Sequence, residues 1–206
     1  MIDPQQPTVF VVDDDDAVRD SIYELVESVG LPFEGYRSAL DFLEVLEPDR
    51  PGCLVLDVRM AEMSGLALQQ QLNEMAITLP VIILTGHGDV PMAVAAMKNG
   101  ALDFIQKPYR EQALLDSINA ALLKNAEDRR ARSMDHILQA RLATLTERER
   151  EVFEYLRLGD ASKAIARKLA ISPRTVETHR HNLLHKLAVS SVNELLALLA
   201  AQEVDN

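Results

Sequence analysis

Four consecutive aspartates follow a strand-like apolar segment near the start of the chain, in TVFVVDDDDAVRDSI. Carboxylates this close together disfavour one another's ionisation, because like charges repel. A hard divalent cation removes that repulsion, and Mg²⁺ prefers oxygen ligands and commonly binds one or two carboxylates together with phosphate oxygens. The run from Asp13 to Asp16 is therefore either merely solvated or partly engaged in holding a cation.

Polar residues also end the other apolar segments. In open α/β sheets, ligands bind outside the carboxyl ends of the strands. Asp57 ends the segment CLVLD, Thr85 ends PVIILT, and Lys107 follows LDFIQ. Together with Asp13 and Asp14, these residues would bring three carboxylates, a hydroxyl and an amine to one edge of a sheet. One polar strand end is common by chance, but the whole set indicates a site.

This set of groups is suited to phosphoryl transfer. An ionised Asp57 that faces Mg²⁺ and Lys107 could attack phosphorus and form an acyl phosphate. The metal and the ammonium would neutralise the charge that develops on the phosphoryl oxygens, and Thr85 could bond one of those oxygens. The alternative for each residue is an ordinary one: a solvated acid, a turn hydroxyl or a surface lysine.

Strand-length apolar segments alternate with helical patterns through the first part of the chain. The strand segments are TVFVVD, FEGY, CLVLD, PVIILT and LDFIQ, and helices are expected at about residues 17–29, 38–46, 65–76, 89–98 and 110–124. This alternation indicates βαβ units, a parallel sheet and an α/β fold. Asp15 and Asp16 fall where the first helix begins, where acids accept from free N–H groups and favour the helix dipole.

Three segments resemble a CheY-like receiver domain: VVDDDDAVRDSI, LVLDVRMAEMSG and VIILTGHGDVPMAVAAMKNGALDFIQKP. The last of them also resembles the FixJ-type branch of the response regulators. The resemblance covers about residues 8–124 and implies a doubly wound, five-stranded parallel sheet in the order 2-1-3-4-5. It implies that Asp57 is the phosphoacceptor and that Mg²⁺ is bound by Asp13, Asp14, Asp57 and the backbone carbonyl of Arg59.

The same resemblance implies which residues respond to the phosphate. Thr85 and Lys107 would contact it, and Phe104 would be the switch aromatic. A buried aromatic near a strand end needs no such role, so plain core packing is the alternative for Phe104. The Lys107–Pro108 peptide bond would be cis, which suits a tight turn.

A long segment after the predicted receiver favours helix almost throughout. No proline follows Pro108 until Pro173, and no glycine follows Gly100 until Gly159. We therefore expect the last receiver helix to continue into an exposed helical linker, with a flexible tether as the less favoured alternative. The predicted organisation is a receiver over residues 1–124, a helical linker over 125–142 and a second domain over 143–206.

The second domain is predicted to be all-α, with four helices. TERE begins with a capping box formed by Thr146 and Glu149, and Ser172 followed by Pro173 is a strong start signal for another helix. SKAIARKLA and PRTVETHRHNLLHKL are separated only by IS, which gives them helix-turn-helix proportions, and SSVNELLALLAA forms the last helix.

The second helix of that pair has two different faces. A 3.6-residue period places three apolar side chains on one of them: Val176, Leu183 and Leu187. The opposite face carries side chains that suit contacts with phosphates and base edges: Arg174, Thr178, His181 and His185. An amphipathic surface helix is the alternative. Of the histidines on this helix only His181 and His185 could share a face, and no metal site is expected because no Cys, Asp or Glu is expected beside them.

The segment LTEREREVFEYLRLGDASKAIARKLAISPRTVETHRHNLLHKL resembles the four-helix LuxR/NarL-type DNA-binding domain, over about residues 143–204. The base contacts that this resemblance implies are Glu177, Thr178 and His181. The phosphate contacts that it implies are Arg174, Thr175 and Lys186. Arg180 lies nearer the packed face by periodicity and is included as a further DNA contact.

The charge is distributed unevenly along the chain, whose formal net charge is −11. Residues 1–124 carry 8 Lys and Arg against 20 Asp and Glu, whereas residues 141–206 carry 10 against 9. A domain with so small a positive charge neutralises few phosphates, so a monomer should bind DNA weakly. We therefore expect a homodimer that forms on phosphorylation.

Cysteine usage and hydropathy indicate a compartment. Cys53 is the single cysteine, which excludes an intramolecular disulfide and fits a reducing cytoplasm. No apolar run approaches the length of a membrane span, and the N-terminus lacks the pattern of a signal peptide. We expect a cytoplasmic protein with no membrane partner.

These features predict a response regulator of a two-component system that is not an enzyme. A sensor histidine kinase would phosphorylate Asp57, and the resulting dimer would bind promoter DNA and activate transcription by RNA polymerase. One alternative, an aspartyl-phosphate phosphohydrolase, needs a second acid where Arg59 stands. Another is a phosphorelay or protein-interaction module without DNA binding. Aromatic-hydrocarbon catabolism, as in styrene-responsive regulators, and nitrogen fixation both fit the resemblance as the regulated pathway.

Overall fold

The computed structural model describes residues 6–86 and 90–204 of the chain. It divides into two compact units, residues 1–129 and 130–206. Each unit has its own buried core. The predicted start of the fourth helix at residue 89 lies outside the described residues. The domain boundaries at 124 and 142 stay predictions.

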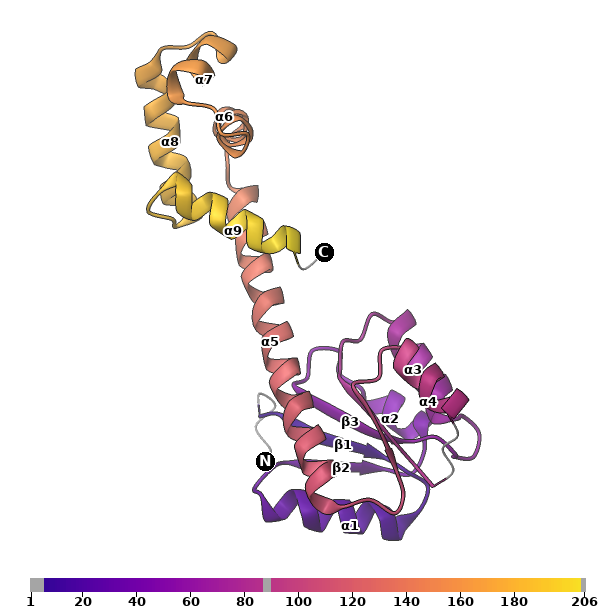
Figure 1. Ribbon diagram of the computed structural model, residues 1–206. Coiled ribbons are helices and arrows are strands. Elements are labelled where there is room, and N and C mark those ends of the chain that lie inside the picture. Colours follow the sequence, from indigo (N-terminus) through magenta and orange to yellow (C-terminus); the bar gives the residue numbers. More distant parts are fainter. Residues whose placement is uncertain (1–5, 87–89, 205–206) are drawn as a thin grey trace. The chain divides into compact units, whose positions relative to one another are not determined.

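The first unit is built on a parallel sheet (Figure 1). Its strands are β1 (Thr8–Val12), β2 (Phe33–Tyr36), β3 (Gly52–Asp57), β4 (Val81–Thr85) and β5 (Asp103–Gln106). Their order is β2-β1-β3-β4-β5, which confirms the predicted topology. Strands β1, β3 and β4 are buried along their whole length, because helices cover both faces of a doubly wound sheet.

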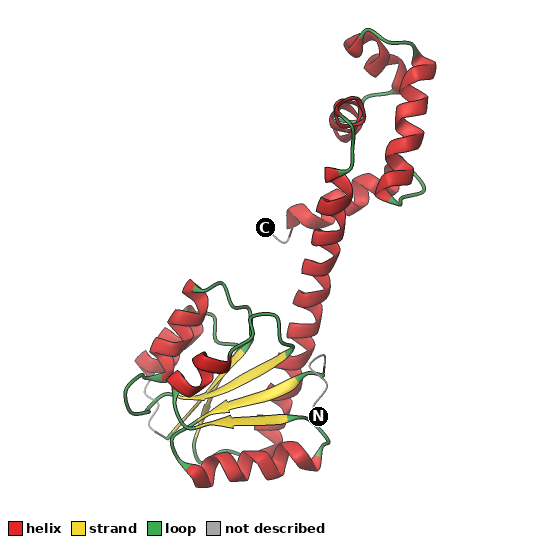
Figure 2. Cartoon of the chain, turned by 180° about the vertical axis from the view of Figure 1, so that it is seen from behind, coloured by secondary structure: helices red, strands yellow, loops and turns green. Residues whose placement is uncertain are grey.

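Two layers of helices cover the sheet (Figure 2). The helices before the last one are α1 (Asp16–Ser28), α2 (Ala39–Val45), α3 (Gly65–Glu74) and α4 (Val90–Lys98). One core joins alternate strand residues to α2, α3 and α4, through Phe42, Leu68 and Ala96. The other core joins the opposite strand residues to α1 and to the last helix, through Ile22 and Ile118. The side-chain period of two along each strand divides the apolar residues between these cores.

The last receiver helix, α5 (Glu111–Ala143), runs without a break for 33 residues. This confirms the expected continuation into a helical linker. The first part of that continuation is bound to the receiver unit: the side-chain oxygen of Asn125 accepts from the N–H of Gly52 at 3.1 Å, and Arg129 donates to the carbonyl of Asp49. Asn125 is only 4% exposed.

The second unit is all-helical. It contains α6 (Glu147–Arg157), α7 (Ser162–Leu169), α8 (Pro173–Leu187) and α9 (Val192–Val204). The caps form as predicted: Thr146 and Glu149 make a capping box, and Ser172 accepts from Thr175 N–H with Pro173 in the first turn. Leu138 of α5 lies in the same core as these helices, so the end of the predicted linker packs into this unit.

Candidate phosphoacceptor site and DNA-binding face

The carboxyl edge of the sheet brings together three of the predicted residues. Asp13 follows β1, Asp57 ends β3, and Lys107 follows β5. The ammonium of Lys107 lies 2.6 Å from Asp13 Oδ2 and 2.8 Å from Asp57 Oδ1. The backbone N–H of Lys107 donates to the carbonyl of Thr85 at 2.8 Å. This extension of the β4–β5 pairing places the lysine at the end of the sheet, where its side chain bridges the two acids.

The electrostatics of this cluster leave an excess of negative charge. Burial raises the pKa of Asp13, and the hydrogen bond and charge of Lys107 only partly oppose it. Burial alone would lower the pKa of Lys107, but hydrogen bonds to Asp13 and Asp57 outweigh it, and the net pKa is raised. The ammonium is therefore favoured in its charged form, and the cluster has a net charge of about −1 in a mostly buried position when both acids are ionised.

The other two proposed metal ligands, Asp14 and Arg59, differ in their surroundings. Asp14 is exposed, and the two acids that Lys107 contacts are Asp13 and Asp57. In the part of the chain that the structure describes, no group of three or more His, Cys, Asp or Glu side chains is arranged to hold a metal. Arg59 is beside the acid, because its N–H donates to Asp57 Oδ2 at 2.6 Å. Buried oxygen donors with excess negative charge still suit Mg²⁺ chemically.

Thr85 and Phe104 occupy neighbouring strands. Thr85 is buried at the end of β4. Phe104 is half-buried on β5, pairs in register with Ile83, and packs against the core on the α2, α3 and α4 side. The Lys107–Pro108 bond is cis, as predicted. A switch role for Phe104 stays a prediction, since half-burial against the core also suits plain packing.

Sequence reasoning missed one residue at this edge. Arg19, in the second turn of α1, donates from its guanidinium to the carbonyl of Asp13 at 2.6 Å and also pairs with Asp16. Asp15 caps α1 through Ala17 N–H, and its own N–H donates to Asp13 Oδ1 at 3.0 Å. The prediction that Asp15 and Asp16 lie where the first helix begins is therefore confirmed. The signal for Arg19 was a basic residue one turn into the helix that follows the acids.

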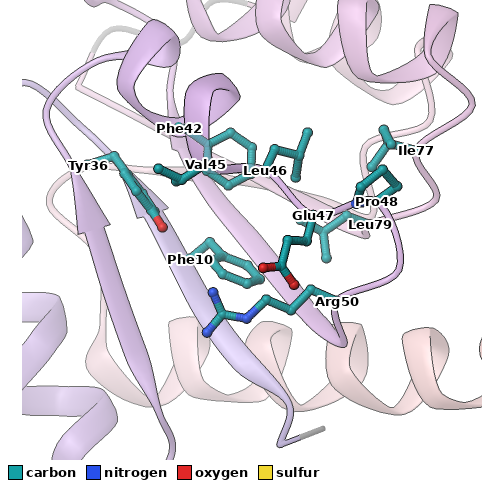
Figure 3. Close-up of a pocket in the computed structure, with 10 residues that line it drawn as sticks. All are labelled: Phe10, Tyr36, Phe42, Val45, Leu46, Glu47, Pro48, Arg50, Ile77 and Leu79. Atoms are coloured by element: carbon teal, nitrogen blue, oxygen red, sulfur yellow. The ribbon is translucent and has the colours of Figure 1, made fainter. Parts of the chain in front are cut away.

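A separate pocket lies between the sheet and α2 (Figure 3). It is lined by apolar and aromatic side chains and by the charged residues Glu47 and Arg50, and Arg50 lies over the Phe10 ring at 5.0 Å from its centroid. Arg50 also pairs with Glu34. The pocket contains none of the predicted phosphoryl-transfer residues and belongs to the packing of the loop before β3.

The predicted DNA-binding helix, α8, has the two faces that its sequence indicates. Val176, Leu183 and Leu187 are fully buried. The exposed side chains include five of the predicted DNA contacts: Arg174, Thr175, Glu177, Thr178 and His181. Arg180 is half-buried, with its guanidinium 3.7 Å from the Glu177 carboxylate. The structure thus separates a packing face from a polar face, as the 3.6-residue period requires.

Lys186, the remaining predicted phosphate contact, is engaged inside its own unit. Its ammonium lies 2.6 Å from Glu149 Oε2 and 3.2 Å from the carbonyl oxygen of Thr144. Glu149 is 4% exposed. Burial raises the pKa of Glu149, but hydrogen bonds from Lys186 and the Thr146 backbone more than offset this, and the net pKa is lowered. Glu149 was expected only as a capping residue, because a contact 37 residues away leaves no local signal.

Comparison with known families agrees with both units. Residues 9–119 match the response regulator receiver domain, and residues 143–199 match the luxR family of bacterial regulatory proteins. The chain belongs to the response regulators that carry a receiver domain and a LuxR-type DNA-binding domain. It is therefore a two-component transcription regulator, a class whose two domains imply a sensor histidine kinase and promoter DNA as partners.

Individual relatives match over nearly the whole chain. The transcriptional regulatory protein FixJ of Azorhizobium caulinodans is 46% identical over 199 residues, covering 96% of this chain and 94% of its own. TdiR of Thauera aromatica is 47% identical over 191 residues, covering 92% and 83%. The solved structure of the response regulator StyR is 45% identical, with a TM-score of 0.86, and covers 95% and 99%. The curated relatives are regulators, which counts against the phosphohydrolase alternative.

In the part of the chain that the structure describes, no helix is both long enough and apolar enough to cross a membrane.

Proposed function

We propose that a sensor histidine kinase phosphorylates Asp57, and that the phosphorylated chain forms a homodimer that binds promoter DNA and activates transcription by RNA polymerase. The observation that supports this most directly is the position of Lys107, whose ammonium lies 2.8 Å from the Asp57 carboxylate. An ionised carboxylate at a sheet edge, already paired with a fixed cation, is suited to attack phosphorus and to have its product stabilised.

Each residue at the carboxyl edge of the sheet has its own chemical role in this proposal. Asp57 supplies the attacking oxygen, and a new P–O bond forms while the bond from phosphorus to the kinase breaks. Lys107 then donates to the phosphoryl group that Asp57 carries, and Thr85 supplies a hydroxyl to it. Asp13, Asp14, Asp57 and the Arg59 carbonyl would hold Mg²⁺. When bound, Mg²⁺ supplies positive charge near the phosphoryl oxygens.

The consequence for DNA binding follows from charge and from the exposed face of α8. Residues 141–206 carry a net charge of only +1, so one copy neutralises few phosphates. A dimer presents two such faces and doubles the contacts. Phosphorylation would shift the receiver population toward a dimerising state, with Thr85 drawn toward the phosphate and Phe104 following it.

The test uses Asp57→Asn together with Asp116→Asn, an exposed acid on α5 as the matched control. The wild type and the two variants are incubated with acetyl phosphate and Mg²⁺. Phosphate incorporation is measured by mass spectrometry, and oligomeric state by light scattering. We expect wild type and Asp116→Asn to gain one phosphate and to form dimers, and Asp57→Asn to do neither. Dimerisation of Asp57→Asn on the same treatment would contradict the proposal.

A further inference from the structure

An open polar hollow lies on the second unit beside the DNA-binding helix. Its lining comes from two elements: Glu149 of α6, and His181, Asn182, His185 and Lys186 of α8. His181, Asn182 and His185 are exposed. The hollow is therefore accessible from the same side as the predicted DNA contacts, and most of its wall is made of hydrogen-bonding side chains.

The one lysine in the hollow contributes little net charge to it. Lys186 donates to Glu149 and to the Thr144 carbonyl, which uses two of the three protons of its ammonium. The Glu149 carboxylate offsets the lysine's positive charge at 2.6 Å. Any additional positive charge that the hollow offers to an anion must therefore come from His181 and His185.

His185 lies on the same stripe of α8 as the expected DNA contacts. Residues spaced by three and four along a helix lie on one face, and Arg174, Thr178, His181 and His185 follow that spacing. All four are exposed. His185 extends the stripe by one turn beyond His181, at the end of the helix that the hollow adjoins.

We propose that His185 binds a backbone phosphate of DNA in this hollow, with His181 beside it, and that DNA affinity is therefore linked to the protonation of these imidazoles. The inference rests on the proposed DNA binding and assigns it a further contact. A phosphate is anionic, so it stabilises the protonated ring. Affinity should be greatest at acidic pH and should fall as pH rises through the range where histidine titrates, about pH 5 to 8.

The charged groups around His185 are consistent with this direction. Glu149 faces it from α6 and is neutralised by Lys186. Arg141, from the end of α5, donates to the Leu187 carbonyl at 3.0 Å. Farther along α8, Glu177 lies one turn before His181 and is 3.7 Å from Arg180. Each acid near the two imidazoles thus has a basic partner, so no unpaired carboxylate among these residues competes with a phosphate for them.

The test measures binding of the full-length protein to a fluorescent duplex of about 30 base pairs of arbitrary sequence, since phosphate contacts are independent of sequence. Affinity is read by anisotropy at low salt, with and without acetyl phosphate, at about pH 6 and about pH 8. We expect wild type to bind about tenfold more tightly at the lower pH, because a charged hydrogen bond to a phosphate contributes about that much affinity. His185→Gln should lose most of that gain, and its salt slope at the lower pH should decrease by about 1.

Two further variants make the result decisive. His185→Arg carries a permanent charge and should bind at the higher pH about as tightly as wild type does at the lower one. His136→Gln removes an exposed histidine of α5 outside the hollow and should keep the full pH dependence of wild type. Thermal unfolding checks that the variants fold. If His185→Gln does not fold, His185→Arg still tests whether a positive charge at position 185 contributes to DNA binding.

The failures of the two proposals are distinguishable. If wild type binds the duplex but His185→Gln keeps its pH dependence and His185→Arg gains no affinity, the phosphate role of His185 is wrong and DNA binding stands. If wild type binds the duplex at neither pH and in neither phosphorylation state, the DNA-binding proposal fails and this inference fails with it.

Discussion

At the scale of single residues, the candidate phosphoacceptor site at the carboxyl edge of the sheet combines three ionisable groups. One ammonium, Lys107, neutralises only one of the two carboxylates that it contacts, Asp13 and Asp57. Both acids are almost completely buried, so the excess charge has little access to water and is costly. The residue types at this edge could be predicted from the sequence, because strand ends of a parallel sheet converge. The approach of Lys107 to Asp57 follows from the same argument, but the second contact of this lysine, with Asp13 at a separation of 94 positions, does not.

Replacing Asp13 should leave thermal stability intact but remove the binding of Mg²⁺. Burial raises the pKa of Asp13, which means that the folded protein disfavours its ionised form. Asp13→Asn should therefore unfold at the same or a higher temperature than wild type in EDTA. Mg²⁺ should raise the unfolding temperature of wild type, since a ligand of the folded state stabilises it, but not that of Asp13→Asn. Equal stabilisation of both proteins by Mg²⁺ would count against a metal role for Asp13.

The same substitution predicts a dependence on pH. Between the ordinary aspartate value of 3.8 and the raised folded value, the folded state binds more protons than the unfolded state. The penalty for ionising Asp13 is therefore complete at neutral pH and diminishes as pH falls through the raised pKa. The difference in unfolding free energy between Asp13→Asn and wild type, measured by urea titration in EDTA, should shrink over that acidic range.

The Glu149–Lys186 pair in the second unit should give the opposite pH dependence of the unfolding free energy: stability should decrease, and not increase, as pH falls. The lowered pKa of Glu149 gives stability that is present above its ordinary value of 4.5 and is lost as pH falls through the lower folded value. Glu149→Gln should destabilise the unit at neutral pH by about 2 kcal/mol, the usual range for a charged hydrogen bond. Urea unfolding of residues 130–206 measures this, with Glu151→Gln as control, because Glu151 is only partly buried and its partner Arg148 is exposed.

At the scale of elements, the helices follow from sequence signals that are local. The caps at Asp15, Thr146 and Ser172 form where the sequence places them. The attachment of α5 to the receiver could not be predicted in this way. Asn125 reaches Gly52 across 73 residues, and an asparagine in a helix carries no indication of such a partner. The sequence therefore predicts that the linker is helical, but it does not predict which linker residues contact the receiver.

Removing the Asn125 side chain should weaken the receiver unit. Asn125→Ala leaves the buried N–H of Gly52 without its acceptor, which costs about 1–3 kcal/mol. Asn119→Ala, an exposed asparagine on the same helix, should change the unfolding free energy by less than about 0.5 kcal/mol. Chemical denaturation of both variants measures the difference. Hydrogen exchange in residues 125–129 should also become faster in Asn125→Ala alone.

A substitution at the start of α7 should stabilise the second unit. Its N-cap, Ala161, has no side chain that can accept from the first helical N–H groups. Ala161→Ser should therefore add about 1 kcal/mol of stability to the second unit. Ala164→Ser, at the third residue of the same helix, is the control and should bring no comparable gain, because the favoured position for the capping hydroxyl is the N-cap itself. Differential scanning calorimetry of residues 130–206 distinguishes the two outcomes.

At the scale of the whole molecule, charge is divided between the parts. Residues 1–124 carry 20 acids against 8 bases, and residues 141–206 carry nearly equal numbers. This division is readable from composition alone. The acidic part repels DNA that comes within roughly a Debye length of it, about 10 Å at moderate salt. Residues 130–206 alone should therefore bind a duplex more tightly than the unphosphorylated full-length chain.

Salt titration tests that charge argument. The affinity difference between residues 130–206 and the full-length protein should narrow as salt increases, because screening removes the repulsion. If the difference is the same at low and high salt, direct blockage of the DNA-binding face is the better explanation. Anisotropy with one labelled duplex measures both proteins under identical conditions.

The two-faced α8 also bears on how such regulators diversify. Its buried side chains, Val176, Leu183 and Leu187, hold the second unit together, and its exposed stripe takes no part in that core. Substitutions on the stripe can therefore accumulate at little cost in folding. A duplicated copy of this gene could acquire a new set of promoters through a few surface substitutions on α8, while the candidate phosphoacceptor site stays unchanged. Recognition and folding are thus open to selection independently.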